Sequence, residues 1–440
     1  MIIRNIGELM GIVPEGVLLK RGAEMSDTGI LRNAWLRIED GRIVDFGGRE
    51  AACFPEARSA DSGDSCGAAQ GGTPPCSMGV QGDSSGIDDG EDVIDAAGGL
   101  VLPAFCDSHT HIVYAGSREG EFLDKINGLS YEEIASRGGG ILNSSDLLHE
   151  TSEDELYRQS MVRVKEMMAA GTGAMEIKSG YGLRREDELK MLRVIHRIRE
   201  TVPAEVRATF LGAHAVGRGF THEAYVDEVV DMMPEAARLA DFVDVFCDEG
   251  FFTVEDTARI LEAGRACGLR PKIHANELAV SGGVEVGVKY DALSVDHLER
   301  TTEAQIEALR GSGTMPTMLP GSSFFLGIPF GKARDFISAG LPLALASDYN
   351  PGSSPSGDMR FVMALACIRM HLNPVEALNA VTLNSAYAMG ISDRLGSITR
   401  GKDANLIISL PGWNLTRLAY NYTTPWISRV FLKNLIFAKN

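Results

Sequence analysis

The stretch Pro103–Arg118, PAFCDSHTHIVYAGSR, is the part of the sequence from which the fold can be read. It places His109 and His111 two residues apart, after an apolar run of β-strand character. Because alternate side chains of an extended strand point the same way, both imidazoles can reach one metal ion at the end of that strand. Paired histidines also occur on ordinary exposed strand ends, so this spacing alone indicates a metal site only weakly.

The composition describes an ordinary globular chain with an acidic surface. The chain has 440 residues, which is too long for one small hydrophobic core. Of these residues, 44% are hydrophobic and 23% are charged, as in ordinary globular proteins. The net charge of −18 disfavours nucleic acid and anionic membranes as partners. The sequence contains no apolar run of membrane-spanning length and no signal-peptide pattern at its start. We therefore expect a cytoplasmic protein. The net charge says little about a small substrate, because a site can carry its own local positive charge.

Apolar runs of strand character alternate with amphipathic helical patterns through residues 100–397. Ser152 with Glu155 fits an N-terminal capping box, and Gly171 stands where a helix-ending glycine belongs. The predicted strands are Val101–Phe105, Gly173–Ile177, Arg207–Leu211, Phe242–Phe246, Lys272–His274, Ala292–Val295, Thr314–Met318 and Leu341–Ser347. This alternation predicts an α/β fold, a (β/α)₈ TIM-like barrel. A doubly wound open sheet is the alternative, and the absence of a G-x-G-x-x-G motif after the first strand counts against it.

The two ends of the chain have β character. We expect residues 1–99 and 398–440 to form one small β-sandwich domain, with the barrel of residues 100–397 inserted between its halves. Residues 54–92 are rich in Gly, Ser, Asp and Pro and carry few large apolar side chains. Such a segment cannot bury enough apolar surface to offset its ordering entropy, so we predict a disordered insertion there.

Histidines recur at the predicted strand ends, where barrel enzymes place their active sites. Five of the nine histidines fall there, and the eighth strand ends in Asp348. The five are His109, His111, His214, His274 and His297. Three imidazoles and a carboxylate suit one borderline divalent ion such as Zn²⁺ or Fe²⁺. Such an ion lowers the pKa of a bound water, which makes hydrolysis of a carbon–nitrogen bond the natural reaction.

A family resemblance extends from about residue 109 to 390. The chain resembles the imidazolonepropionase family of the amidohydrolase superfamily in HTHIVYAGSREGEF, IKSGYGL, FLGAHAV, IHANEL, ALSVDHLE and SDYNPGSSP. The resemblance implies ring opening of 4-imidazolone-5-propanoate by water, which gives N-formimidoyl-L-glutamate in histidine degradation. It also implies a homodimer.

By motif position, the resemblance implies a ligand set and a substrate pocket. One metal ion per chain, divalent or trivalent, zinc or iron, would be bound by His109, His111, His274 and Asp348. The residues implied to contact the substrate are Arg118, Tyr181, His214, Glu277, Asn350, Gly352 and Ser353. Among them, Arg118 would bind the propanoate, because an arginine can donate two parallel hydrogen bonds to a carboxylate.

Three residues are predicted to be catalytic: Glu277, His297 and Asp348. Asp348 would take a proton from the attacking water, and His297 or His214 would stabilise the oxyanion. Glu277 would transfer a proton to the ring nitrogen as the carbon–nitrogen bond breaks. Lys178 follows the second predicted strand, whereas binuclear relatives carry a bridging lysine on the fourth. We therefore expect a single metal and a structural or supporting role for Lys178.

Two other functions fit parts of the pattern. A deaminase of the same superfamily, acting on a cyclic amidine, would use the same metal motif. Arg118 and the motif around Tyr181 argue against it, because a neutral base needs no contact to a carboxylate. A non-catalytic barrel scaffold is the second alternative, but such proteins usually lose ligands, and all four are present here.

Overall fold

The computed structural model describes residues 1–51, 92–129, 133, 139–433 and 435–438. Apart from Asp92, the insertion predicted at 54–92 lies outside the described residues. The described part contains two sheets, a barrel and a separate mixed sheet. Among the described helices, none is long and apolar enough to cross a membrane.

Eight parallel strands form the wall of the barrel, in sequence order from β6 to β13. They are β6 (Phe105–Asp107), β7 (Thr172–Lys178), β8 (Glu205–Ala213), β9 (Phe242–Cys247), β10 (Arg270–Ala275), β11 (Ser294–His297), β12 (Met315–Met318) and β13 (Ala344–Leu345). Thr110 and Tyr349, which lie just past β6 and β13, form an isolated parallel bridge that nearly closes the ring. The predicted (β/α)₈ barrel is confirmed.

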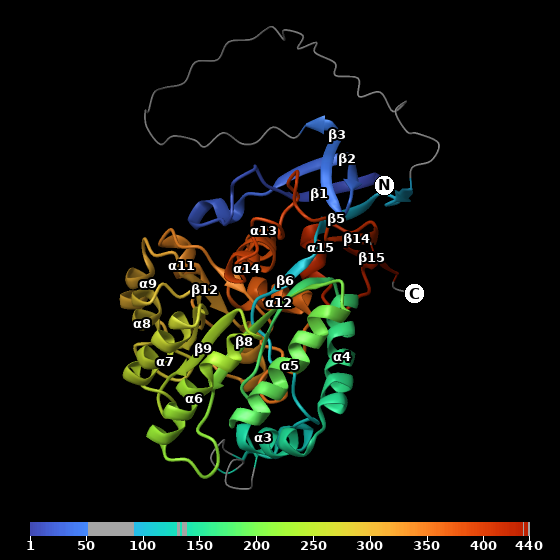
Figure 1. The fold of residues 1–440 in the computed structure, drawn as a ribbon. Helices are drawn as coiled ribbons and strands as arrows, with labels where there is room; N and C mark the ends of the chain where they lie inside the picture. Colours follow the sequence, from blue (N-terminus) through green and yellow to red (C-terminus); the bar gives the residue numbers. More distant parts are fainter. Residues whose placement is uncertain (52–91, 130–132, 134–138, 434, 439–440) are drawn as a thin grey trace, which may run out of the picture.

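Helices connect the strands and cover the barrel from outside (Figure 1). Before β10 the helices are α1 (Glu119–Ile126), α3 (Ile141–Glu150), α4 (Glu153–Ala169), α5 (Arg185–Thr201), α6 (His222–Ala236) and α7 (Val254–Ala266). After it come α8 (Gly283–Lys289), α9 (Glu303–Leu309), α10 (Pro320–Leu326), α11 (Ala333–Ser338), α12 (Met359–Arg369), α13 (Pro374–Val381), α14 (Leu383–Ala388) and α15 (Leu415–Tyr420). The side chain of Ser152 accepts a hydrogen bond from the backbone N–H of Glu155, as the capping pattern predicted for α4.

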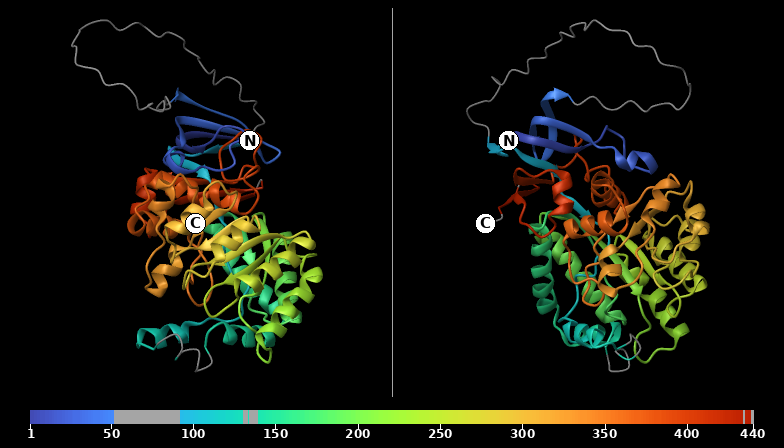
Figure 2. Two further views of the ribbon diagram at one scale, coloured as in Figure 1. Left: turned by 90° about the vertical axis from the view of Figure 1, so that its left-hand side faces the viewer. Right: turned by 180° about the vertical axis from the view of Figure 1, so that it is seen from behind.

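The second sheet is built from both ends of the chain, as predicted, and its order is β16-β15-β14-β5-β1-β2-β3, with β4 beside β1. Its strands are β1 (Ile2–Ile12), β2 (Gly29–Glu39), β3 (Arg42–Ala51), β4 (Val93–Asp95), β5 (Gly99–Pro103), β14 (Leu406–Pro411), β15 (Ile427–Leu432) and β16 (Leu435–Ala438). We call it the terminal sheet. It has a hydrophobic cluster of its own, which includes Ile3, Leu36, Val101 and Leu406. Figure 2 shows it capping one end of the barrel, opposite the end where α3 lies.

The strand predicted at Val101–Phe105 is wrong as a single element. Its first part belongs to β5, which pairs with β1 and β14 in the terminal sheet, and β6 of the barrel begins at Phe105. The backbone N–H of Ala104 donates to Asn405, whereas that of Phe105 donates to Gly171, so the chain changes sheets within one residue. Both parts are apolar because both are buried, and the sequence therefore shows no break. The domain limits 1–99, 100–397 and 398–440 stay a prediction.

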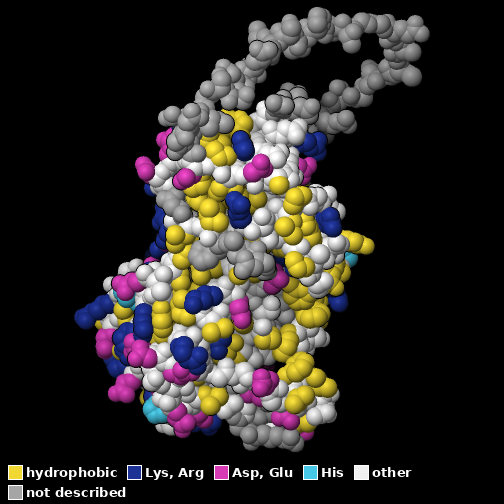
Figure 3. Space-filling model, turned by 90° about the vertical axis from the view of Figure 1, so that its right-hand side faces the viewer, with side chains coloured by type: hydrophobic (Ala, Val, Ile, Leu, Met, Phe, Trp, Pro, Cys, Tyr) yellow, Lys and Arg dark blue, Asp and Glu magenta, His cyan; other side chains and the backbone are white. Residues whose placement is uncertain are grey.

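Charged and apolar side chains are mixed on the surface. On the face shown in Figure 3, acidic and basic side chains lie among one another and among hydrophobic ones, over both the terminal sheet and the barrel. Among the residues that the structure describes, that face therefore has no continuous basic region to which a polyanion could bind. This agrees with the net charge of −18.

The contact between barrel and terminal sheet can be tested at Gly171. Its φ is +103°, and a Cβ there would lie 2.6 Å from Cδ1 of buried Ile407. Gly268 also lies just after a helix and also has a positive φ, but no atom of the described residues lies within 4 Å of its Cβ position. Gly268→Ala should lower the free energy of unfolding by about 1–2 kcal/mol, the cost of left-handed backbone. Gly171→Ala should cost a further ~1–3 kcal/mol from overpacking. Denaturant unfolding measures both, and equal losses would contradict this account of the junction.

Candidate metal centre and active site

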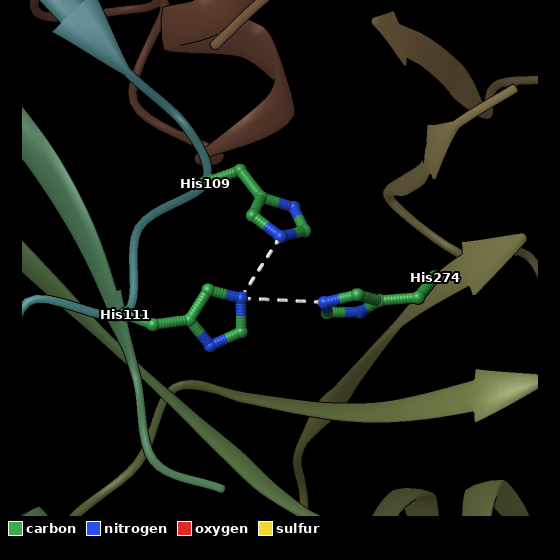
Figure 4. Close-up of side chains that lie close together, drawn as sticks. All are labelled: His109, His111 and His274. Atoms are coloured by element: carbon green, nitrogen blue, oxygen red, sulfur yellow. Dashed lines mark hydrogen bonds between the residues drawn. The ribbon is translucent and has the colours of Figure 1, made fainter. Parts of the chain in front are cut away.

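Three histidine side chains point to one position at the carboxyl ends of the barrel strands (Figure 4). His109 and His111 lie on the segment after β6, and His274 lies on β10. Nε2 of His111 is 3.2 Å from Nε2 of His109 and 3.4 Å from Nε2 of His274. Oδ1 of Asp348 lies 3.7 Å from His109 Nε2 and 3.5 Å from His111 Nε2. All four side chains are buried, and their four donor atoms face a single site.

Backbone hydrogen bonds bring Asp348 to the paired histidines. The N–H of Asp348 donates to the carbonyl of His109 (3.0 Å), and the N–H of His111 donates to the carbonyl of Tyr349 (2.9 Å). Asp107 strengthens the junction, because its carboxylate accepts from the backbone N–H (3.0 Å) and hydroxyl (2.5 Å) of Ser347. Asp348 itself has a φ of +55°, in the left-handed region. The first and last barrel strands thus deliver their ligand candidates together.

Two buried carboxylates determine which nitrogen of two histidines faces the site. Nδ1 of His109 is hydrogen-bonded to Asp296 (2.7 Å), and Nδ1 of His274 lies 3.0 Å from Asp244. A carboxylate can only accept, so these Nδ1 atoms carry the proton and each Nε2 keeps a lone pair. Burial lowers the pKa of His109 well below its usual value, and it lowers that of His274 to about 3 against the opposing effect of Asp244. Both imidazoles are neutral at pH 7, the form that binds metal.

The carboxylates are held in turn by two buried lysines. Lys178 donates to Glu176 (2.5 Å) and Asp244 (2.8 Å), and Lys272 donates to Glu176 and to the carbonyl of Ser108 (3.0 Å). We call Glu176, Lys178, Asp244, Lys272 and Asp296 the buried ion network; none of them is exposed. Burial by itself lowers the pKa of Lys178, but Asp244 and Glu176 outweigh it and raise that pKa. Lys178 is therefore a charged partner of carboxylates.

Sequence reasoning missed four members of this network, Glu176, Asp244, Lys272 and Asp296. The available signal was a charged residue inside an otherwise apolar strand, as in AMEIK, FVDVF and SVDH. Such residues are almost never fully buried unless they are paired. Which of them pair depends on how the barrel brings non-adjacent segments together, because Asp296 reaches His109 and Lys272 reaches Glu176.

His297 and Glu277 lie beside the metal site. Nε2 of His297 is 3.5 Å from Glu277, and its Nδ1 is 3.5 Å from Glu299. Burial lowers the pKa of His297, but these two carboxylates outweigh it and raise that pKa to about 10. Burial raises the pKa of Glu277 to about 7 and that of Asp348 to about 6. His297 also forms a group of potential ligands with His109 and Asp348.

Tyr181 and His214 form an aromatic wall next to His111. The rings of His111 and His214 are stacked, with centroids 5.2 Å apart and an interplanar angle of 17°. The Tyr181 ring is 5.5 Å from His214 and 6.0 Å from His111. Nδ1 of His214 is hydrogen-bonded to the carbonyl of Gly180 (2.9 Å), so its Nε2 is the nitrogen left for other partners.

The loop after Asp348 lies against Arg118. Asn350 folds this loop, because its Oδ1 accepts from the backbone N–H groups of Gly352 and Ser353, both at 2.8 Å. The hydroxyl of Ser353 donates to Asp348 (3.3 Å). A Cβ on Gly352 would lie 2.1 Å from Nη1 of Arg118, so the guanidinium touches the glycine backbone. The structure thus places every residue of the predicted site around one region.

The donor set fits a divalent metal ion. His109, His111 and His274 are buried together, and burial lowers the pKa of each below its usual value. Three neutral imidazoles and one carboxylate are the ligands that borderline divalent ions such as Zn²⁺ and Fe²⁺ accept. Nε2 of His111 lies within hydrogen-bond distance of the other two Nε2 atoms, and a bound ion would take the place of these contacts.

Comparisons with known proteins agree with this geometry. Residues 100–433 match the amidohydrolase family model. The chain is 50% identical to an imidazolonepropionase of Flavobacterium johnsoniae, over 99% of both chains. It is 47% identical to one of Christiangramia forsetii, over 98% of both. Among solved structures it resembles an adenosine deaminase from Xanthomonas campestris with bound zinc, with a TM-score of 0.64, 15% identity and coverage of 99% of this chain and 92% of that chain.

The identity to the solved structure is too low to indicate more than a shared fold, whereas the two curated relatives match along the whole chain. The fold, the histidine-rich centre and the full-length matches all agree with the resemblance found in the sequence. The chain belongs to the amidohydrolase family and, within it, to the imidazolonepropionases.

Proposed function

We propose that this chain hydrolyses the cyclic amide bond of 4-imidazolone-5-propanoate to give N-formimidoyl-L-glutamate. The observation that carries the proposal is that Arg118, a partner for a carboxylate, lies beside a centre of buried imidazoles suited to a metal. Its guanidinium touches Gly352, in the loop that follows Asp348, so it lies within the same site. A small anionic substrate with a planar ring fits this combination of charge and aromatic wall.

We propose that one ion, zinc or iron, is held by His109, His111, His274 and Asp348. When bound, it would lower the pKa of a coordinated water and polarise the ring carbonyl. Lys178 is engaged by Glu176 and Asp244, which supports a single ion, because the amine is not free to become a bridging ligand. The choice between zinc and iron is not fixed by these ligands.

Three side chains would transfer protons or stabilise charge during the reaction. Asp348 would accept a proton from the attacking water, and the hydroxyl of Ser353 orients its carboxylate. Glu277, with a pKa raised by burial to about 7, would carry a proton to the leaving ring nitrogen. His297 lies 3.5 Å from Glu277 and would stabilise negative charge on the former carbonyl oxygen. His214 is the alternative for that last role.

Substrate binding would involve two parts of the site. Arg118 would donate to the propanoate, and Tyr181 with His214 would line the ring. Asn350 uses its side chain within its own loop, which supports an indirect contribution through the backbone of Gly352 and Ser353.

The other functions have less support. A deaminase acting on a cyclic amidine would share the metal centre, and the adenosine deaminase is similar in fold alone. A non-catalytic scaffold would not need four converging donors or the buried network behind them. The homodimer and the cytoplasmic location stay predictions.

Activity of the purified protein tests the proposal directly. Incubation with 4-imidazolone-5-propanoate should remove the ultraviolet absorbance of the ring. Removal of the metal with a chelator should abolish this, and added zinc or iron should restore it. Cytosine serves as the comparison substrate, and release of ammonia from it, with no turnover of the imidazolone, would support the deaminase instead.

The role of Glu277 predicts a selective loss of turnover. Glu277→Gln keeps the size and polarity of the side chain but removes the proton carrier, so kcat should fall by about 10²–10⁴-fold. Metal content, measured by elemental analysis, should stay equal to that of the unchanged protein. Unchanged kcat would exclude Glu277 from proton transfer.

The carboxylate behind His109 predicts a metal-binding defect. Asp296→Asn removes the charge that orients Nδ1 of His109, so metal affinity should fall by about 10- to 100-fold. Competition with a chelator measures this affinity, and circular dichroism checks that the barrel is folded. Asp231→Asn, at an exposed position on α6, is the control and should change nothing. Equal affinities of the two variants would mean that Asp296 does not support the site.

A further inference from the structure

Arg118 has only one edge of its guanidinium left for a ligand. Oε2 of Glu121 accepts from Nε (2.8 Å) and Nη2 (2.6 Å) of Arg118, which occupies the inner edge of the group. A guanidinium has five N–H groups in a fixed fork. Three remain, and two of these, one on Nη1 and one on Nη2, lie on the outer edge. That edge can still donate two parallel hydrogen bonds to a carboxylate.

Gly352 fixes the position of the same guanidinium from another side. A Cβ there would lie 2.1 Å from Nη1, 2.6 Å from Cζ and 3.2 Å from Nη2 of Arg118. No side chain can occupy that space while the arginine stays in place. The N–H of Gly352 is bound by Asn350, so the loop cannot easily withdraw from the contact.

Glu121 is itself held from two directions. Its Oε1 accepts from the backbone N–H of Gly140 (3.0 Å) and from Nδ2 of Asn143 (3.4 Å), at the start of α3. The helix that carries it, α1, packs on α10 through stacked rings of Phe122 and Phe325, 5.4 Å apart. The carboxylate therefore has a defined place, and it can impose that place on Arg118.

We propose that Glu121 and Gly352 are positioning residues that determine specificity for a carboxylate substrate, by directing the outer edge of Arg118 toward it. The inference rests on the proposed contact between Arg118 and the propanoate. The side chain of Arg118 is 11% exposed and that of Glu121 is 15% exposed. Solvent therefore screens the attraction between the two charges only incompletely. If the arginine could rotate freely, the enzyme would bind the carboxylate group of the substrate more weakly. The rate of ring opening would not change.

The test compares two substrates, 4-imidazolone-5-propanoate and its neutral propanamide analogue. Glu121→Ala should lower kcat/KM for the carboxylate substrate by about tenfold or more, the effect of disturbing a charge-assisted hydrogen bond. The change should lie in KM, with kcat and metal content unchanged. For the propanamide, kcat/KM should stay the same. Glu121→Gln keeps an acceptor oxygen and should restore part of the loss.

The control is Glu119→Ala, in the same first turn of α1, where the side chain is exposed. It should match the unchanged protein with both substrates. Gly352→Ala should reproduce the loss of Glu121→Ala, because its Cβ would displace the guanidinium. Thermal melting of each variant establishes that it is folded, and Glu121→Gln alone suffices if Glu121→Ala does not fold.

Arg118→Ala separates the failure of this inference from failure of the function proposed above. If Arg118→Ala leaves KM for the carboxylate unchanged, the contact between Arg118 and the propanoate is wrong. If Arg118→Ala raises that KM but the Glu121 and Gly352 variants do not, only the positioning role is wrong. Equal losses with carboxylate and propanamide would likewise overturn specificity as the role of Glu121.

Discussion

The ion pair between Lys178 and Asp244 is the interaction on which the metal centre depends. Asp244 lies 2.8 Å from Lys178 and 3.0 Å from His274, with no exposure of the charged side chains. A buried charge without its partner is strongly destabilising, commonly by about 3–5 kcal/mol. Each member of the network must therefore keep its place. This requirement fixes the ring of His274, and Asp296 does the same for His109.

The barrel provides the second requirement, that distant parts of the chain meet. His111 and Asp348 are far apart in sequence, yet the bonds between residues 109–111 and 348–349 join them where the ring of strands closes. Arg118 lies in the segment that follows His111, and Gly352, in the loop that follows Asp348, contacts it. The same closure therefore brings together the proposed metal ligands and the proposed substrate contacts. The terminal sheet lies at the end of the barrel opposite α3 (Figure 2).

The sequence was informative where local pattern decides structure. Alternating strand and helix patterns predict the barrel, and histidines at strand ends predict where His109, His111 and His274 gather. The supporting residues were missed because their role comes from pairing between strands: Asp296 acts on His109 across the barrel, 187 positions away. The change of sheets at Ala104 was missed because an apolar run looks the same in either sheet. Local periodicity contains neither kind of information.

The central claim is that the chain binds a single metal ion while Lys178 stays ion-paired with Asp244. A crystal structure of the metal-loaded protein with anomalous scattering data tests it most directly. We expect one ion, about 2.0–2.2 Å from nitrogen atoms of His109, His111 and His274 and from an oxygen of Asp348. Lys178 should still contact Asp244. A second ion, or Lys178 bound to a metal, would contradict it.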